Sequence, residues 1–584
     1  MIEKTEERAD ALESQLDAVG LKTVQPGDRI VRHVVTGESE ENRGLSYSGL
    51  ERGPSAPRPE GRLEEKGKLA ILAAIAGALL LFFVRLGDYP FLDPDEARFA
   101  RTSVEMMRSA DYVVPTFEGE PRLVKPPLLH WVQASLFQLG GPNEMLARLP
   151  AAASTFVSLL LVAWIGWRRF GVEGSAWAAV TFLTFPLVAL IARIGTLDAL
   201  LSVHVLAVLA LDLVQHDHKE LERSGVIGLL LGLAFLVKGP VGVVLPLAMI
   251  LAGRTATGRE VMPSMKTVLT TVGALLAVVM PWGLVFVRRV GGGNVLHVLR
   301  TETIDRAANG TAHVEHWWYY LAVCLVAFLP WAGPLFLGTV RGLTRWHDPD
   351  SPTGPYAAAA FSAGLVFFSL SKGKLPSYIL PLAPLAALIV TFELGQELIN
   401  PKRRRGGSSL VVMTLVAMSF GLGAAAMTSL ENDAQGAAYV GAAAFGLAAL
   451  VALFGMLKNA PRIVYGAAAV GSFAFLLAIV LGAPSVLATT KSAAPLVDAV
   501  PALRSARPLV VVDIRLPSLT YYADRVPEWV ASENLGERLD RGDAPFVVIA
   551  DVDLDRLPKN VRKQLREVAH SGKLFVFEPV GVAP

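Results

Sequence analysis

Side chains that could do chemistry gather in short polar segments between long apolar runs. The sequence PDEAR places Asp95 and Glu96 side by side, with Arg98 one turn later on an expected helix. A carboxylate at a helix start can accept a proton from a hydroxyl group or orient a phosphate, or it can simply interact with the helix dipole. Arg98 can bind a phosphate or form an i,i+3 ion pair with Asp95. Asp95 and Glu96 are therefore the catalytic candidates.

A second group of polar side chains lies in other short segments of this kind, and its lysines and arginine suit an anionic group such as a lipid phosphate. Lys125 precedes two prolines, which fix the backbone and hold this lysine in a rigid turn. The alternative is an interfacial lysine that extends its charged end out of the bilayer. The other members are Asp198 in TLDALL, Lys238 in KGP, Arg306 in ETIDR, and Lys374 and Tyr378 in KGKLPSY. Helix-terminal charge or interfacial anchoring remains the alternative for Asp198, Lys374 and Tyr378.

The composition indicates what kind of chain must position these residues. Of the 584 residues, 52% are hydrophobic and 18% are charged, whereas a soluble globular protein carries about 25% charged residues. Charge concentrates at the two ends and in short connecting segments, which predicts a polytopic membrane protein and excludes an ordinary cytosolic enzyme. The net charge of +2 gives no basic field for nucleic acid. The single cysteine, Cys324, excludes an intramolecular disulfide and a cysteine-based metal site.

The apolar runs predict about thirteen transmembrane helices, since a bilayer core needs roughly 20 apolar residues in a helix. The expected spans are 69–86, 145–168, 175–193, 196–214, 224–237, 239–253, 267–288, 317–339, 356–370, 375–396, 409–429, 436–457 and 462–486. Lys238-Gly239-Pro240 interrupts the stretch 224–253. A lysine at a helix centre costs about 2.5–3.5 kcal/mol and proline breaks a helix. We therefore expect two short helices at this position.

The two ends differ from the apolar region 69–486, whose long outer loops are expected at 87–144 and 289–316. Residues 1–68 are polar and predict a disordered cytoplasmic tail. Residues 487–584 predict a small α/β domain, because apolar strands alternate with helices. Strands are expected at LVVVDI, PFVVIAD and KLFVFEP, and helices at SENLGERLDR and PKNVRKQLREVAHSG.

The basic residues of the short loops predict the orientation in the membrane. Lysines and arginines mark cytoplasmic loops, and PKRRRGG at 401–407 is the strongest such anchor. With a cytoplasmic N-terminus and thirteen spans, the C-terminal domain lies outside and all the polar segments share the outer face. A transporter more often places ionisable residues at mid-membrane on broken helices. One-sided clustering therefore favours an active site at the outer membrane surface.

PDEAR, KPP, TLDALL, KGP and KGKLPSYILPLAPLA form a combination that resembles a known class of enzymes. They are similar to the GT-C glycosyltransferases that use polyprenyl-phosphate sugars, above all the aminoarabinose lipid A transferases and the related protein O-mannosyltransferases. The resemblance covers roughly residues 70–400 and implies a GT-C fold, with Asp95 as the catalytic carboxylate. The residues that it implies at the donor phosphate are Lys125, Arg306, Lys374 and Tyr378, and the other substrate-site candidates are Arg98, Asp198 and Lys238.

Two positions depart from that pattern. Val124 stands where the lipid A transferases have a glutamate, and Thr303 stands where they have a histidine. Those positions are associated with a bound metal in the relatives, and neither residue here is a suitable ligand. His313 and His316 in HVEH are weak metal candidates. No metal site or cofactor is therefore expected, while a weakly bound divalent cation stays open.

The expected protein is an integral-membrane glycosyltransferase of the bacterial inner membrane. It would move a sugar from a polyprenyl phosphate to a lipid, glycan or protein acceptor on the extracytoplasmic face, with no nucleic-acid partner. The alternatives are a lipid or sugar transporter or flippase, and a multi-span scaffold whose C-terminal domain binds partners. The residues do not indicate which sugar or which acceptor is used.

Overall fold

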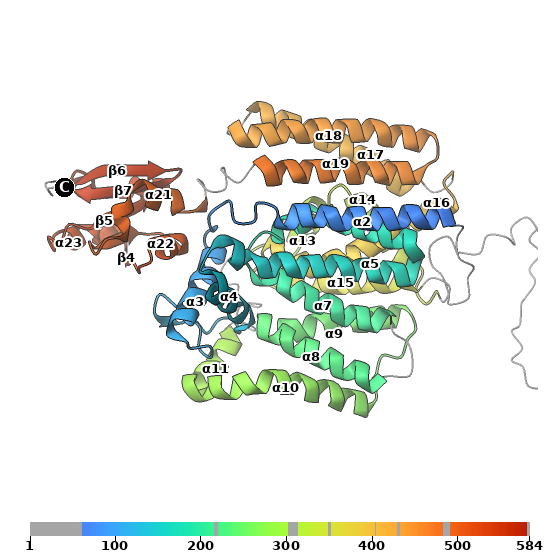
Figure 1. The fold of residues 1–584 in the computed structure, drawn as a ribbon, viewed down its shortest axis with the longest axis horizontal. Helices are drawn as coiled ribbons and strands as arrows, with labels where there is room; N and C mark the ends of the chain where they lie inside the picture. Colours follow the sequence, from blue (N-terminus) through green and yellow to red (C-terminus); the bar gives the residue numbers. More distant parts are fainter. Residues whose placement is uncertain are drawn as a thin grey trace, which may run out of the picture. The chain divides into compact units, whose positions relative to one another are not determined.

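The computed structural model describes residues 61–214, 220–301, 314–348, 352–402, 405–428, 432–482 and 491–580. Nearly all of the predicted tail 1–68 lies outside these residues, and helix α2 (Gly61–Phe83) takes in its last part. Most of the described chain is helical, and a five-stranded sheet lies near the C-terminus (Figure 1). The predicted fold class, a polytopic α-helical membrane protein with a small C-terminal α/β domain, is confirmed.

Apolar helices run side by side through the larger part of the described chain (Figure 1). After α2 they are α5 (Glu144–Leu183), α7 (Leu197–Val214), α8 (Glu220–Lys238), α9 (Val241–Ala256), α10 (Met265–Val290), α13 (Tyr319–Ala327), α14 (Ala332–Thr344), α15 (Thr353–Leu370), α16 (Ala383–Ile399), α17 (Gly406–Thr428), α18 (Asn432–Leu457) and α19 (Pro461–Gly482). Within the described ranges, nine helical stretches are long and apolar enough to cross a membrane. Each of the thirteen predicted spans overlaps helical structure within its described residues, and the number that cross the bilayer stays a prediction.

Glycine and proline set the helix breaks. Gly171 has a φ of 76° and divides α5 into two helical parts, in line with the expected spans 145–168 and 175–193. Helices α8 and α9 meet at Gly239, whose φ is 65°, so two short helices flank Lys238 as predicted. The span expected over 317–339 is not one continuous helix, because the chain breaks between α13 and α14. Pro330 lies in this break and has no N–H to continue a helix.

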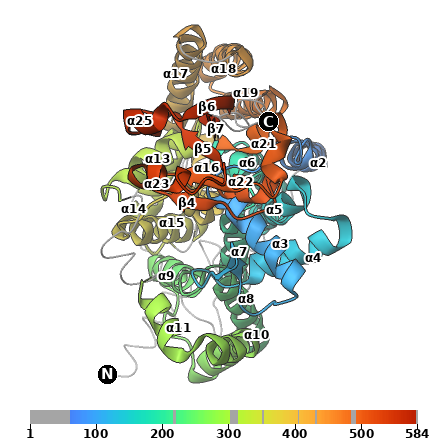
Figure 2. The ribbon, with the colours of Figure 1, turned by 90° about the vertical axis from the view of Figure 1, so that its left-hand side faces the viewer.

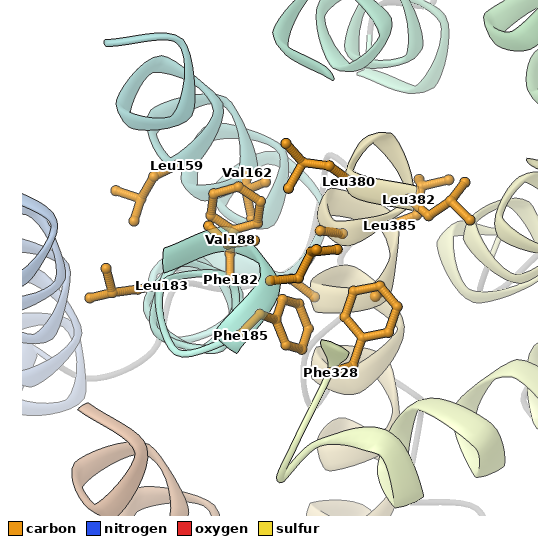
Figure 3. Close-up of a cluster of buried hydrophobic side chains, with 14 of the residues drawn as sticks. Leu159, Val162, Phe182, Leu183, Phe185, Val188, Phe328, Leu380, Leu382 and Leu385 are labelled. Carbon is orange, nitrogen blue, oxygen red and sulfur yellow. The ribbon is translucent and has the colours of Figure 1, made fainter. Parts of the chain in front are cut away.

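A buried core joins the end of α5 to the break between α13 and α14 (Figure 3). Helix α6 (Pro186–Ile191) follows α5, and Phe185 just before it meets Phe328 edge to face with ring centroids 4.9 Å apart. Trp331 donates its indole N–H to the Thr184 hydroxyl at 3.0 Å. The short 3-10 helix η3 (Pro376–Leu382) leads into α16 beside this cluster. The core thus fixes η3, which contains Tyr378, and the turn before it, which contains Lys374.

The outer loop after α2 is folded rather than extended. It contains α3 (Asp95–Ser109), the strands β1 (Thr116–Phe117) and β2 (Glu120–Pro121), and α4 (Leu128–Gly140). Glu118 and Gly119 form the two-residue turn of the β1–β2 hairpin, both with positive φ, as a type I′ turn requires. These elements and α11 (Gly292–Leu299) lie at the same end of the helices (Figure 1).

The C-terminal domain is a sheet with helices on both faces. Its strands β3 (Leu509–Val512), β4 (Glu528–Val530), β5 (Phe546–Ala550), β6 (Leu565–Ser571) and β7 (Leu574–Pro579) lie in the order β4-β3-β5-β7-β6. The pairs β3–β4 and β3–β5 are parallel, and β5–β7 and β7–β6 are antiparallel. Side chains alternate between faces: Val511 packs towards α21 (Ala494–Ala499) and α22 (Pro517–Tyr522), and Val510 towards α23 (Leu535–Leu539).

One predicted element of this domain is wrong. PKNVRKQLREVAHSG forms only a single helical turn, α25 (Lys559–Arg562), and its second half is strand β6. Gly572, with a φ of 56°, is the first residue of the two-residue turn that returns the chain as β7. Across this hairpin Arg566 pairs with Glu578, and His570 stacks on Phe575. These cross-strand contacts outweigh the helical preference of the segment.

Candidate active site

A cavity of about 760 Å³ opens at one end of the helices, which is the end where the outer loop lies. Its walls are mostly apolar and come from the α8–α9 turn, α10 and the end of α15. Three predicted site residues, Lys125, Lys238 and Tyr378, line it. Arg288 of α10 also lines it and was not singled out from the sequence. The size is that of a ligand pocket, and apolar walls with a few cations suit a lipid chain that ends in an anionic group.

Lys238 is held by two other predicted residues. Its ammonium donates to Asp198 at 2.6 Å and lies 4.0 Å from the centroid of the Tyr378 ring. The Lys238 and Asp198 side chains are each only 10% exposed. The carboxylate and the aromatic face both interact favourably with this ammonium. Since Asp198 balances its charge, Lys238 contributes less positive potential to the cavity than an isolated lysine would.

Lys125 stands on the turn between β2 and α4. Pro127 caps α4, and the Lys125 side chain is half-buried at the cavity wall. Val124 beside it also lines the cavity and is 38% exposed. The turn therefore presents one cation to whatever fills the cavity, together with the apolar residues Leu123, Val124 and Pro126.

Lys374 lies close to this region but is bound elsewhere. It is buried, and its ammonium donates to the backbone carbonyl of Glu315 at 2.9 Å. Val314 forms a β-bridge with Gly373. The chain that begins at Val314 therefore lies beside the turn before η3. Arg306, Thr303 and His313 lie outside the described residues. Lys374 thus fastens two segments together, and its proposed phosphate contact stays a prediction.

Asp95 is the first residue of α3 and is accessible. Its side chain is 45% exposed, and Arg98 donates to it at 3.3 Å. This is the i,i+3 ion pair that the sequence allowed as the alternative role for Arg98. Asp95 is not among the described residues that line the cavity, although its helix starts at the same end of the bundle. The geometry leaves one face of this carboxylate open to solvent and to an acceptor.

Glu96 has different surroundings from its neighbour. Arg148 binds both its carboxylate oxygens at 2.7 and 2.9 Å, and the side chains of this pair are 1% and 0% exposed. The backbone N–H groups of Leu92 and Gly195 donate to it at 2.9 and 2.8 Å. The remaining donors of Arg148 go to the carbonyls of the loop before α3, including that of Tyr89 at 2.7 Å. These contacts favour a structural role for Glu96, which joins the start of α3 to α5 and α7.

Sequence reasoning did not find Arg148, because it lies at the start of an apolar run and nothing in its neighbours marks it. It also did not find Asp212, which is buried in α7 at the end opposite to Asp198. Asp212 accepts hydrogen bonds from Arg254 at 2.8 Å and from the Tyr356 hydroxyl at 2.7 Å. Asp198 and Asp212 are separated by roughly 21 Å along the helix at 1.5 Å per residue. The Asp212 cluster is therefore a separate ion pair between helices.

No group of three or more His, Cys, Asp or Glu that could hold a metal ion occurs among the described residues. His130 is buried in α4, where its ring contacts the Ser103 hydroxyl at 2.9 Å. Burial lowers the pKa of His130 to about 3, so this ring stays neutral. His316 stacks on Trp318 at the surface.

Asp93, just before α3, connects the outer loop to the C-terminal domain. Its carboxylate accepts hydrogen bonds from the backbone N–H of Ser518 at 2.8 Å and from the Ser518 hydroxyl. Burial raises the pKa of Asp93 to about 6, although the Ser518 hydrogen bonds oppose this. Asp93 was not a candidate from the sequence. The candidates in PDEAR were Asp95 and Glu96, which follow it.

This pKa predicts how docking of the C-terminal domain depends on pH. The docked carboxyl binds its proton more tightly than an exposed one with the usual pKa of 3.8, so docking should strengthen as the pH falls through about 6. The gain in docking strength is complete below about pH 3.8, the usual pKa of the carboxyl group. Hydrogen exchange at 517–522, corrected for intrinsic rates, should slow between about pH 7.5 and about pH 5. Asp93→Asn should remove the dependence, and faster corrected exchange in acid would contradict the prediction.

Parts of this chain are similar in sequence to known proteins. Residues 124–284 match the family model described as dolichyl-phosphate-mannose-protein mannosyltransferase. The chain is 31% identical over 322 residues to the undecaprenyl phosphate-alpha-4-amino-4-deoxy-L-arabinose arabinosyl transferase of Aeromonas salmonicida, and 31% identical over 362 residues to one from Pseudomonas fluorescens. These matches cover 53% and 60% of this chain, and only 57% and 59% of the relatives.

Among solved structures, ArnT from Cupriavidus metallidurans bound to undecaprenyl phosphate matches with a TM-score of 0.69 at 22% identity. The match covers 88% of this chain and 99% of that ArnT. The chain has the ArnT fold. Together with the sequence matches, this fold confirms the predicted resemblance to the GT-C glycosyltransferases. Within the ArnT fold, the matched residues 124–284 begin at the Lys125 turn and end in α10, so they contain Asp198, Lys238 and much of the cavity wall.

Proposed function

We propose that this chain is an integral-membrane glycosyltransferase that moves a sugar from a polyprenyl phosphate, undecaprenyl phosphate above all, to a lipid, glycan or protein acceptor. The observation that supports the proposal most is the cavity. Its walls are mostly apolar, and Lys125, Lys238 and Tyr378 also line it. Such a site suits an isoprenoid chain and its phosphate. The arabinosyl transferase relatives are named for an undecaprenyl-phosphate-linked sugar, and the ArnT fold has been solved with undecaprenyl phosphate bound.

The reaction would be a single displacement at the anomeric carbon. An acceptor oxygen attacks this carbon, the bond to the phosphate oxygen breaks with inversion, and the phosphate leaves with the electron pair. Asp95 would take the proton of the acceptor hydroxyl. Lys125 would stabilise the charge that develops on the leaving phosphate, while Lys238, paired with Asp198, would orient Tyr378 at the cavity wall.

Transfer can be tested with purified protein in lipid vesicles. A short-chain polyprenyl phosphate carrying a radiolabelled sugar should lose the sugar to an acceptor extracted from the cell envelope, with release of the free polyprenyl phosphate. A lipid or sugar transporter would instead move the labelled lipid across the bilayer with its sugar–phosphate bond intact. Intact donor after long incubation with a panel of labelled sugars and acceptors would contradict the proposal.

The proposed site lies on the extracytoplasmic face only if the orientation from the charge rule holds. We expect the residues before 69 to be cytoplasmic and those after 487 to be extracytoplasmic, in an inner-membrane protein. Reporters active on only one side of the membrane, fused at either end, check this. Both ends on the same side would contradict the thirteen-span count and the placement of the motifs.

A further inference from the structure

The C-terminal domain binds the tip of the β1–β2 hairpin through hydrogen bonds. The two carboxylate oxygens of Glu118 accept hydrogen bonds from the Thr520 hydroxyl at 2.8 Å and from the indole N–H of Trp529 at 3.2 Å. Thr520 belongs to α22 and Trp529 to β4, so two separate elements of the domain hold one side chain. Figure 2 looks onto the end of the molecule where α22 lies against α3.

The same hairpin tip is held from the other side by α3. The backbone N–H groups of Glu118 and Gly119 donate to the Glu105 carboxylate at 2.9 and 3.2 Å. Arg101 joins Glu105 to the C-terminal domain, because it donates to Glu105 at 2.9 Å and to Asp524 at 2.6 Å. The Arg101 side chain is 9% exposed. The hairpin tip is therefore fixed between α3 and the sheet domain by hydrogen bonds on both sides.

A second contact holds the chain just before α3. Besides the bonds from Ser518 to Asp93, the Tyr522 hydroxyl accepts from the Phe91 backbone N–H at 2.7 Å and donates to Glu144 at 2.5 Å. The domain thus reaches both ends of the segment that carries Asp95. A domain that was only tethered to the membrane part would not need polar contacts at these particular places.

We propose that the C-terminal sheet domain is a positioning part of the active site. Its hydrogen bonds to Glu118 fix the position of Lys125 at the cavity. Only Arg122, Leu123 and Val124 separate β2 from Lys125, so a shift of the hairpin moves this lysine. The inference rests on the proposed transferase function for the role of Lys125. Glu118, Thr520 and Trp529 act through the hairpin and are positioning residues, not catalytic ones.

Glu118→Ala is the decisive variant, since it removes both acceptor oxygens. We expect kcat to fall about tenfold to a hundredfold, as for a catalytic group displaced by about 1 Å. KM for the polyprenyl donor should change less than kcat, because the apolar cavity walls remain. Glu118→Gln should restore much of the rate, since its amide can accept from Trp529 and donate to Thr520. The matched control is Glu120→Ala, which removes the same charge from an exposed position on the same hairpin.

Trp529→Phe tests the contact from the domain side and covers the case in which Glu118→Ala fails to fold. It deletes the indole N–H and keeps a ring, and with Glu118→Ala it should be strongly non-additive in kcat. Equal losses in Glu120→Ala, additive losses in the double variant, or a wild-type kcat in both Glu118→Ala and Trp529→Phe would overturn the proposal.

Hydrogen exchange separates this inference from the proposed function. In detergent-solubilised full-length protein, exchange at 116–127 should rise in Glu118→Ala and Trp529→Phe and stay unchanged in Glu120→Ala. If the wild-type protein transfers no sugar, the transferase proposal fails while the exchange pattern still decides whether the domain holds the hairpin. Unchanged exchange in both Glu118→Ala and Trp529→Phe would show that the domain does not hold the hairpin, whatever the activity.

Discussion

Lys125→Ala is expected to slow sugar transfer by about 10²–10³-fold while the protein stays folded. Removing one preorganised electrostatic contact to a developing anion typically costs about 2.7–4 kcal/mol of activation free energy. Lys125 is placed to make such a contact, since it stands on a proline-fixed turn and lines the cavity. Single-turnover release of polyprenyl phosphate measures the effect, and size-exclusion behaviour in detergent confirms the fold.

Two variants make this result specific. Lys372→Ala removes an exposed lysine from the turn before η3 and should leave the rate near that of the wild type. Lys125→Arg keeps the charge but changes its shape and reach, so an intermediate rate is expected. Wild-type turnover in Lys125→Ala would show that this lysine only anchors the turn at the membrane interface.

The second large effect is expected at Glu96, and it concerns stability. Glu96→Ala leaves the Arg148 guanidinium buried without its carboxylate, and breaking a buried ion pair from one side costs about 3–5 kcal/mol. Loss of the N–H contacts from Leu92 and Gly195 adds to this. A large drop in the temperature of thermal unfolding and a poor yield of monodisperse protein are therefore expected.

The neighbouring carboxylate provides the matched comparison. Asp95→Ala removes an exposed ion pair, for which a loss of at most about 1 kcal/mol is expected, and it should abolish most of the transfer. If Asp95→Ala unfolded the protein while Glu96→Ala remained stable and lost only activity, the roles assigned to the two residues would be reversed.

Much of the architecture follows from local features of the sequence. A span is a run of apolar residues long enough for a bilayer, and a break is a glycine or proline within it, so the helices on either side of Lys238 could be predicted. The polar turns were expected on one face because loops between successive spans alternate between the two sides. Lys125, Lys238 and Tyr378, which line one cavity in the structure, come from three such polar segments.

Only the tertiary structure separates Asp95 from Glu96. Both stand in PDEAR with the same chemistry, and the difference comes from Arg148, which is far away in the sequence and is buried against only one of them. The same holds for strand β6, whose sequence prefers a helix until β7 is paired beside it. The contacts of Asp93 and Glu118 with the C-terminal domain join residues about four hundred positions apart in the chain, as the bond from Thr520 to Glu118 shows. Long-range partners of this kind leave no periodic pattern in the sequence, because the position of each one is set by packing rather than by its neighbours.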